Sequence, residues 1–254
     1  MNILELEGVG RSFGGVRAVH DVSFSVGAGQ LFGVIGPNGA GKTTLFNLVT
    51  GLIRPDKGCV TLNGVETTGK SPEQIATLGI ARTYQTIRLF DTMSVRGNVM
   101  VGGHAGLRYS LLDVFTRRRS YRDGERLLGE RADRLLETVG LAHRADDPAA
   151  SLSYGEQRRL ELARALAAEP KVLMLDEPAA GMNTREAIEL GDLLRRLVAD
   201  AGLTVILIEH NVRMIMRLCD RIAVMNFGQK LAEGAPAEVR NDPAVVEAYL
   251  GAGA

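Results

Sequence analysis

The 254-residue sequence has no tryptophan, only two cysteines, and equal numbers of basic and acidic residues, 30 of each. Because the formal net charge is zero, the chain lacks the global basic field that recruits nucleic acid. Cys59 and Cys219 lack the spacing of a metal site, so we expect two reduced thiols, as in a cytosolic protein. No apolar run approaches the ~18 residues that cross a bilayer, so we expect no membrane span. Residues 1–5 lack the basic start of a signal peptide, so none is expected.

Short apolar runs alternate with amphipathic stretches along most of the chain. We expect strands at 3–7, 22–26, 31–35, 59–62, 171–175, 204–208 and 222–225, and helices at 44–50, 131–139, 159–168, 184–198 and 212–219. This order predicts an α/β fold with a mainly parallel sheet covered on both faces. The alternating run 22–26 and the turn signal Asn63-Gly64 predict additional antiparallel strands. Residues 86–152 have few strand signals, which predicts a helical segment inserted into the α/β core.

Residues 36–43, GPNGAGKT, match the phosphate-binding P-loop pattern G-x-x-x-x-G-K-[ST]. The glycines let successive backbone N–H groups of Asn38, Gly39, Ala40 and Gly41 point at phosphate oxygens. Lys42 would reach the β- and γ-phosphates, and Thr43 would hold Mg²⁺ through its hydroxyl. Thr44 opens a helix whose positive end would face the same phosphates. A strand, a glycine loop and a helix therefore occur in the order that a nucleotide site needs.

Two acids, Asp176 and Glu177, end the apolar run 171–175. Carboxylates at the end of a buried strand are costly unless they serve a cation or a proton. Asp176 is expected to hold Mg²⁺ directly or through water, and Glu177 to polarise a water that attacks the γ-phosphate.

The signature segment, residues 152–157 (LSYGEQ), begins a helix. Ser153 and Glu156 form the capping-box pattern that starts such a helix. A helix start with a free hydroxyl and a glycine is also an anion site, so the two interpretations coexist.

These motifs together resemble the nucleotide-binding subunits of ABC transporters, whose signature is LSGGQ; here Tyr154 replaces the first glycine. The resemblance covers nearly the whole chain and implies a P-loop NTPase (RecA-like) core at 1–85 and 153–254 with a helical subdomain at 86–152, in one domain. It implies that Ser153 and Gly155 complete the ATP site of a second subunit in a head-to-tail dimer.

The same resemblance assigns three further residues. Gln85 matches the glutamine that senses Mg²⁺ and the attacking water, and His210 matches the switch histidine that contacts the γ-phosphate. Phe13 matches the aromatic residue that stacks on adenine. Asn183 departs from the family pattern, which usually has Asp there; it can still cap the following helix with Glu186, but it lacks the carboxylate.

Finer matches in residues 180–183, 210–222 and 242–251 are similar to ATPases of branched-chain amino acid importers. Urea-importer and lipopolysaccharide-export ATPases look alike and stay as alternatives, and a soluble ABC ATPase acting on DNA or ribosomes is a further one. The resemblance implies an ATP- and Mg²⁺-dependent motor on the cytoplasmic face of the inner (plasma) membrane. Its partners would be a second ATPase, identical or homologous, transmembrane permease subunits and, indirectly, a solute-binding protein. The resemblance implies import of branched-chain or other hydrophobic amino acids, although the specificity for the transported solute lies in other subunits.

Two features of the helical insertion have competing interpretations. Ile87, Leu89, Phe90 and Met93 would either accept a coupling helix of the permease or pack within the subdomain. The arginines at 117–119, 122 and 126 would either touch lipid head groups or form a solvated charged face with Glu125 and Glu130.

Overall fold

The computed structural model describes residues 1–104 and 119–250. In chain order the elements are β1 (Asn2–Phe13), β2 (Val16–Gly27), β3 (Leu31–Ile35), α1 (Lys42–Val49), β4 (Lys57–Leu62), β5 (Val65–Glu66), α2 (Pro72–Leu78), β6 (Ile80–Arg82), α3 (Val95–Gly103), α5 (Arg119–Thr138), the 3-10 turns η2 (Ala142–Arg144) and η3 (Ala149–Ser151), α6 (Tyr154–Leu166), β7 (Val172–Asp176), α7 (Thr184–Ala201), β8 (Thr204–Ile208), α8 (Val212–Leu218), β9 (Arg221–Asn226), β10 (Gln229–Gly234), α9 (Pro236–Arg240) and α10 (Pro243–Leu250).

A six-stranded sheet forms the centre of the molecule, in the order β10-β9-β3-β8-β7-β6. Neighbouring strands from β9 to β6 are parallel and only β10 is antiparallel, which confirms the expected mainly parallel sheet. Asp176 at the end of β7 pairs with Ile208 at the end of β8, and Val34 near the end of β3 pairs with Ile208 as well. The segments that follow β3, β7 and β8 therefore leave the sheet at one edge, where ligands of open α/β sheets bind.

A second, antiparallel sheet has the order β2-β1-β4-β5. Asn63 and Gly64 turn the chain between β4 and β5 with positive φ angles of 48° and 74°, so the expected hairpin is present. Strands β1 and β2 extend well beyond the predicted runs 3–7 and 22–26. Several register shifts between these two strands interrupt the apolar alternation, which is why the pattern alone predicted shorter strands.

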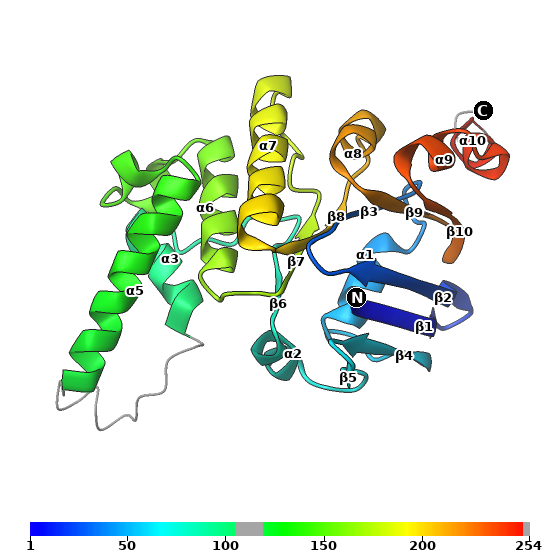
Figure 1. The fold of residues 1–254 in the computed structure, drawn as a ribbon, viewed down its shortest axis with the longest axis horizontal. Coiled ribbons are helices and arrows are strands. Elements are labelled where there is room, and N and C mark those ends of the chain that lie inside the picture. Colours follow the sequence, from blue (N-terminus) through cyan, green and yellow to red (C-terminus); the bar gives the residue numbers. More distant parts are fainter. Residues whose placement is uncertain (105–118, 251–254) are drawn as a thin grey trace.

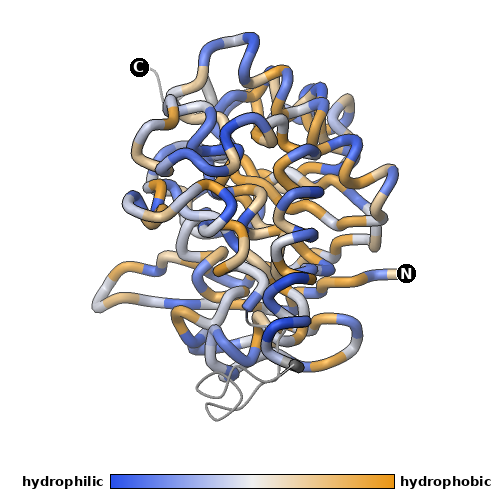
Figure 2. Tube along the Cα trace, turned by 90° about the vertical axis from the view of Figure 1, so that its left-hand side faces the viewer, coloured by the Kyte–Doolittle hydropathy of each residue, from blue (hydrophilic) through white to orange (hydrophobic). Residues whose placement is uncertain are grey.

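The two sides of β3 contribute to different cores. Phe32 and Val34 pack with the antiparallel sheet and α1, whereas Leu31 and Ile35 pack with the helices on the other face. This alternation follows from the period of two along a strand. In Figure 1 the antiparallel sheet and α2 lie on one side of the central sheet and α7 and α8 on the other. Hydrophobic segments of the chain gather inside these layers (Figure 2).

Helices α3, α5 and α6 gather at one end of the molecule (Figure 1). Val99, Leu136 and Leu160 are fully buried where they pack together. The predicted helix at 131–139 is the last part of α5. Arg126 pairs with Glu130 one turn later at 2.7 Å, as a solvated charged face would, whereas residues 117 and 118 of the arginine cluster lie outside the described residues.

No described helix is long and apolar enough to cross a membrane. Both cysteines are free thiols, as expected.

Candidate functional site

The P-loop joins β3 to α1 and is pressed against two neighbouring strands. A Cβ atom on Gly36 would lie 2.1 Å from the carbonyl oxygen of Met225, and one on Gly41 would lie 2.2 Å from that of Ala18. Both glycines also have positive φ angles, 154° and 95°. The loop can therefore take this path only with glycine at these two positions.

Lys42 lies inside this loop at the start of α1, with its side chain folded back along it. Its ammonium donates hydrogen bonds to the carbonyl oxygens of Gly36 at 2.7 Å and Pro37 at 2.9 Å. Burial lowers the pKa of Lys42, and the negative charges of Glu177 and Asp176 oppose that shift. The cation is thus placed among the loop's backbone and near both acids.

The other expected phosphate-loop residues differ in exposure. Asn38, Gly39 and Thr43 are exposed, Thr44 is half-buried, and Ala40 is buried. The exposed Thr43 hydroxyl at the first turn of α1 is an oxygen donor of the kind that Mg²⁺ prefers.

Asp176 is buried at the end of β7 and forms an ion pair with Arg82, Nη2 to Oδ2, at 2.8 Å. Arg82 ends β6 and also donates to Asn47 Oδ1 on α1 at 2.6 Å. One guanidinium thereby ties the P-loop helix to the strand that carries both acids. Sequence patterns do not reveal this role of Arg82, because a pair separated by 94 positions leaves no local pattern.

Two of the expected residues, Gln85 and His210, converge on Glu177. Gln85 Nε2 donates to Glu177 Oε2 at 3.0 Å, and His210 Nδ1 lies 3.7 Å from the same oxygen. The backbone of Glu177 has a φ of 50°, and its N–H donates to the carbonyl oxygen of Ile208 at 2.9 Å. This strained turn aims the carboxylate away from the buried strand and toward Gln85 and His210.

Glu209 stabilises the loop that follows Glu177. It is buried, and its carboxylate accepts the N–H of Ala179 at 2.9 Å. Burial raises the pKa of Glu209. No local pattern reveals this role of Glu209, because its partner lies 30 positions away.

The capping box of the signature segment is present as predicted. The N–H of Glu156 donates to Ser153 Oγ at 3.4 Å, and Glu156 Oε2 accepts the N–H and the hydroxyl of Ser153, each at 2.8 Å. These bonds, with a smaller contribution from Arg144, lower the pKa of Glu156. Asn183 and Glu186 form the second predicted box at the start of α7.

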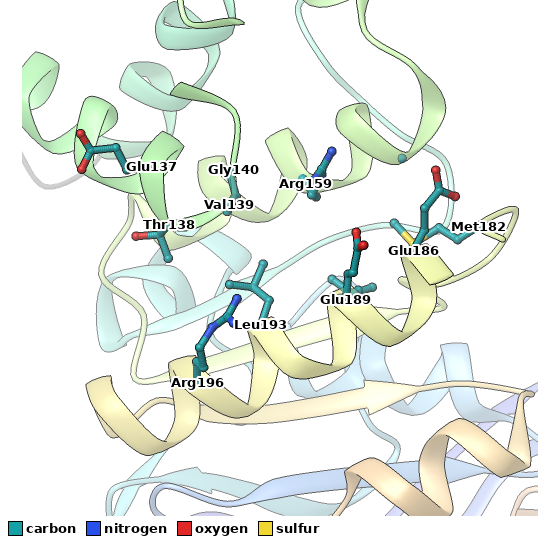
Figure 3. A pocket seen from close by; sticks show the side chains of 12 residues that line it. Glu137, Thr138, Val139, Gly140, Arg159, Met182, Glu186, Glu189, Leu193 and Arg196 are labelled. Carbon is teal, nitrogen blue, oxygen red and sulfur yellow. The ribbon is translucent and has the colours of Figure 1, made fainter. Parts of the chain in front are cut away.

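No hydrogen bond or ion pair among residues 1–104 and 119–250 joins Ser153 or Gly155 to the P-loop of the same chain. Gly155 instead faces α7: a Cβ atom there would lie 3.0 Å from Glu186 Oε1. Gly155 and Glu186 line a cavity of about 350 Å³ between α5, α6 and α7, which Arg159 and Glu189 also line (Figure 3). This cavity does not include the phosphate loop.

Phe13 lies at the end of β1, in the turn of the first hairpin. Its side chain is 44% exposed, and the guanidinium of Arg11 lies 5.0 Å from the ring centroid. The returning strand β2 passes Gly41 at Ala18, so this hairpin stands beside the P-loop with an exposed aromatic ring.

Comparison with known proteins places this geometry in a family. The family model "ABC transporter" matches residues 19–180, and "Branched-chain amino acid ATP-binding cassette transporter" matches residues 229–254. The high-affinity branched-chain amino acid transport ATP-binding protein LivG of Salmonella typhimurium is 42% identical over 98% of both chains. The lipopolysaccharide export system ATP-binding protein LptB of Haemophilus influenzae is 35% identical over 99% of this chain and 98% of its own.

The fold is similar to that of solved ATP-binding cassettes. The structure of the ADP conformation of an ATP-binding cassette of an ABC transporter aligns with a TM-score of 0.86 and 35% identity, over 99% of each chain. The α/β core with an antiparallel sheet and helices at one end is therefore the cassette fold.

Replacing Lys42 with alanine is expected to weaken nucleotide binding about 10- to 100-fold, because a charge-assisted contact to phosphate is lost. Isothermal titration calorimetry with ATP measures the change, and Lys57→Ala, at an exposed lysine of β4, is the matched control. Equal ATP affinity in the two variants would contradict the P-loop assignment.

Proposed function

This chain belongs to the ABC transporter ATP-binding family, and we propose that it is the ATP-hydrolysing subunit of an importer for branched-chain amino acids. The convergence of Gln85 and His210 on Glu177, at the sheet edge that also holds the P-loop, is the observation that supports hydrolysis. The greater identity to LivG than to LptB, and the match of the C-terminal segment, favour the amino acid importer over the exporter.

ATP phosphates would bind the N–H groups of residues 38–41 and the Lys42 ammonium, in place of the loop carbonyls that Lys42 now contacts. The positive end of α1 favours the same charge. Phe13 would stack on the adenine ring. Each of these contacts orients the γ-phosphate toward the edge where Glu177 stands.

Glu177 would accept the proton of the attacking water, since its carboxylate is held at the end of β7 with one oxygen already hydrogen-bonded to Gln85. Gln85 and His210 would orient that water and the γ-phosphate. The side chains of Thr43, Asp176 and Gln85 offer oxygen donors that fit Mg²⁺. Arg82 pairs with Oδ2 of Asp176, so the other carboxylate oxygen can face the metal ion. When bound, Mg²⁺ supplies charge neutralisation at the β- and γ-phosphate oxygens.

Ser153 and Gly155 would act on the ATP of a second subunit in a head-to-tail dimer. Ser153 is exposed and lies at the N-terminus of the 13-residue helix α6, where an anion is stabilised. Among residues 1–104 and 119–250, no hydrogen bond or ion pair joins these two residues to their own P-loop, which supports a role at a partner's site.

A shallow groove of about 300 Å³ offers a docking surface for a permease subunit. Phe90 lines it and is 48% exposed, with the guanidinium of Arg164 lying 5.9 Å from the ring centroid. Val101 and Ala165 add apolar surface. Met93 is half-buried, so of the two residues Phe90 is the one available to a partner. Docking here would hold the subunit peripherally on the cytoplasmic face of the plasma membrane, with a solute-binding protein on the other side.

Glu177→Gln is expected to retain ATP binding and lose about 10²- to 10⁴-fold in turnover, because the amide cannot accept a proton from water. Phosphate release and ATP affinity are measured in parallel, with Glu189→Gln as the control, because this carboxylate of α7 pairs with Arg185 and not with Gln85 or His210. Hydrolysis at the wild-type rate would exclude Glu177 as the base.

Phe90→Asp is expected to abolish assembly with the permease and solute uptake in vesicles, since it places a charge in an apolar contact. The basal ATPase rate should stay near the wild-type rate because Phe90 forms no hydrogen bond or ion pair with Gln85, Glu177 or His210 in the described part of the chain. Leu127→Asp is the matched control, since Leu127 is similarly exposed (54%) on α5. Uptake that survives in Phe90→Asp would move the docking surface elsewhere.

A further inference from the structure

Arg158, on the first turns of α6, binds the backbone of the segment that carries Gln85. Its Nη1 donates to the carbonyl oxygen of Tyr84 at 2.9 Å, and its Nη2 donates to the carbonyl oxygen of Gln85. The side chains of Tyr84 and Gln85 are exposed, whereas Arg158 is buried. One guanidinium therefore fixes two consecutive peptide groups of the segment that carries Gln85.

Arg158 is itself held in one orientation. Glu161, one turn further along α6, pairs with Nη1 at 3.2 Å, and both side chains are almost fully buried. Burial raises the pKa of Glu161, and the charge of Arg158 opposes that shift. A buried charge is tolerated only with such a partner, so Arg158 cannot turn away from residues 84 and 85 without a large cost.

Tyr154 links Arg158 to the loop that follows Glu177. Its hydroxyl lies 3.0 Å from Arg158 Nη2, and the guanidinium lies 5.4 Å from the ring centroid. The ring packs so closely on Gly181 that a Cβ atom there would lie 2.9 Å from it. The N–H of Ala180, next to Gly181, donates to the carbonyl oxygen of Glu177 at 3.1 Å. Tyr154 is the residue that replaces the first glycine of the signature.

We propose that Tyr154 and Arg158 are positioning residues that connect the signature segment to the Gln85–Glu177 hydrogen bond of the same subunit. The proposal rests on the roles assigned above to Ser153, Gln85 and Glu177. In this scheme Ser153 would contact the partner's nucleotide. Tyr154 and Arg158 follow it on helix α6, and Gln85 donates to Glu177 at 3.0 Å.

This connection makes hydrolysis in one site depend on the nucleotide that occupies the other. Hydrogen bonds weaken steeply with distance and angle, so a shift of α6 of about 1 Å would break the bonds of Arg158 to residues 84 and 85. Gln85 would then lose the backbone position from which it reaches Glu177. When a partner's nucleotide holds the signature segment in place, the contacts are complete and Glu177 is set for proton transfer.

Arg158→Lys is the test variant because lysine keeps the charge beside Glu161, but its compact ammonium cannot span the separated acceptors that the planar guanidinium reaches with two nitrogens. We expect kcat to fall about tenfold, which corresponds to a rise of about 1.4 kcal/mol in the activation free energy. KM for ATP and the melting temperature should change little, since Lys42 and its loop are untouched. The Hill coefficient for ATP should fall toward 1.

Tyr154→Phe keeps the ring on Gly181 and removes only the hydroxyl that meets Arg158, so a smaller change in the same direction is expected. Arg159→Lys is the matched control, because Arg159 is the next residue of α6 and lines the cavity of Figure 3 without bonding residues 84 and 85. It should keep wild-type kcat and Hill coefficient.

Wild-type kcat and Hill coefficient in folded Arg158→Lys would overturn the inference. If Arg158→Lys loses stability as well as activity, the Tyr154→Phe variant provides the test. A wild-type Hill coefficient in Tyr154→Phe would overturn the inference, and a lowered Hill coefficient would support it. Glu177→Gln is measured alongside. If Glu177→Gln is inactive and Arg158→Lys behaves as wild type, only this inference is contradicted and the proposed function is retained. If Glu177→Gln is fully active, both the proposed function and this inference are contradicted.

Discussion

The buried ion pair between Arg82 and Asp176 is the interaction on which the arrangement of the site depends. Its two side chains are only 5% and 4% exposed and meet at 2.8 Å, and Arg82 also bonds Asn47 on α1. A buried charge pair adds little net stability, but removing one partner would cost about 3–5 kcal/mol. The pair therefore fixes where β6, α1 and β7 end relative to one another, and Glu177 is the next residue along the chain.

From that fixed point the site is assembled by the parallel sheet. Strands β3, β7 and β8 end at one edge, so the P-loop, Glu177 and His210 meet although they are distant in sequence. Gly36 and Gly41 allow the loop to lie against Met225 and Ala18. The signature segment lies in a different part of the molecule, where Gly155 faces Glu186 of α7, and we propose that it acts on the nucleotide of a second subunit.

Much of this could be predicted from local patterns. The predicted bounds of the buried strands 31–35 and 204–208 are those of β3 and β8, because a short continuous apolar run bounded by turn residues is typical of a buried strand. The capping boxes at Ser153 and Asn183 were also predictable, since both partners lie within one turn. Strand β10 and helix α2 were missed, because QKLAEG is polar and residues 72–78 lack a strong apolar period.

Residues that connect distant segments could not be predicted. Arg82, Glu209 and Arg158 each bond a partner 30 or more positions away, and a single charged residue in a motif does not reveal such a partner. Tyr154 appeared only as a departure from LSGGQ until the structure placed its ring on Gly181. These are tertiary contacts, and they depend on packing rather than on sequence spacing.

The central claim is that each ATP site takes Glu177 from one subunit and Ser153 from the other. Mixing two inactive variants tests it: Ser153→Asp keeps a helix N-cap but repels the partner's phosphate, and Glu177→Gln lacks the base. A mixed dimer would have one intact site, formed by Glu177 of the first variant and Ser153 of the second. Random pairing makes half the dimers mixed, so an equimolar mixture should recover about a quarter of the wild-type ATPase rate. A mixture that stays as inactive as either variant alone would contradict the account.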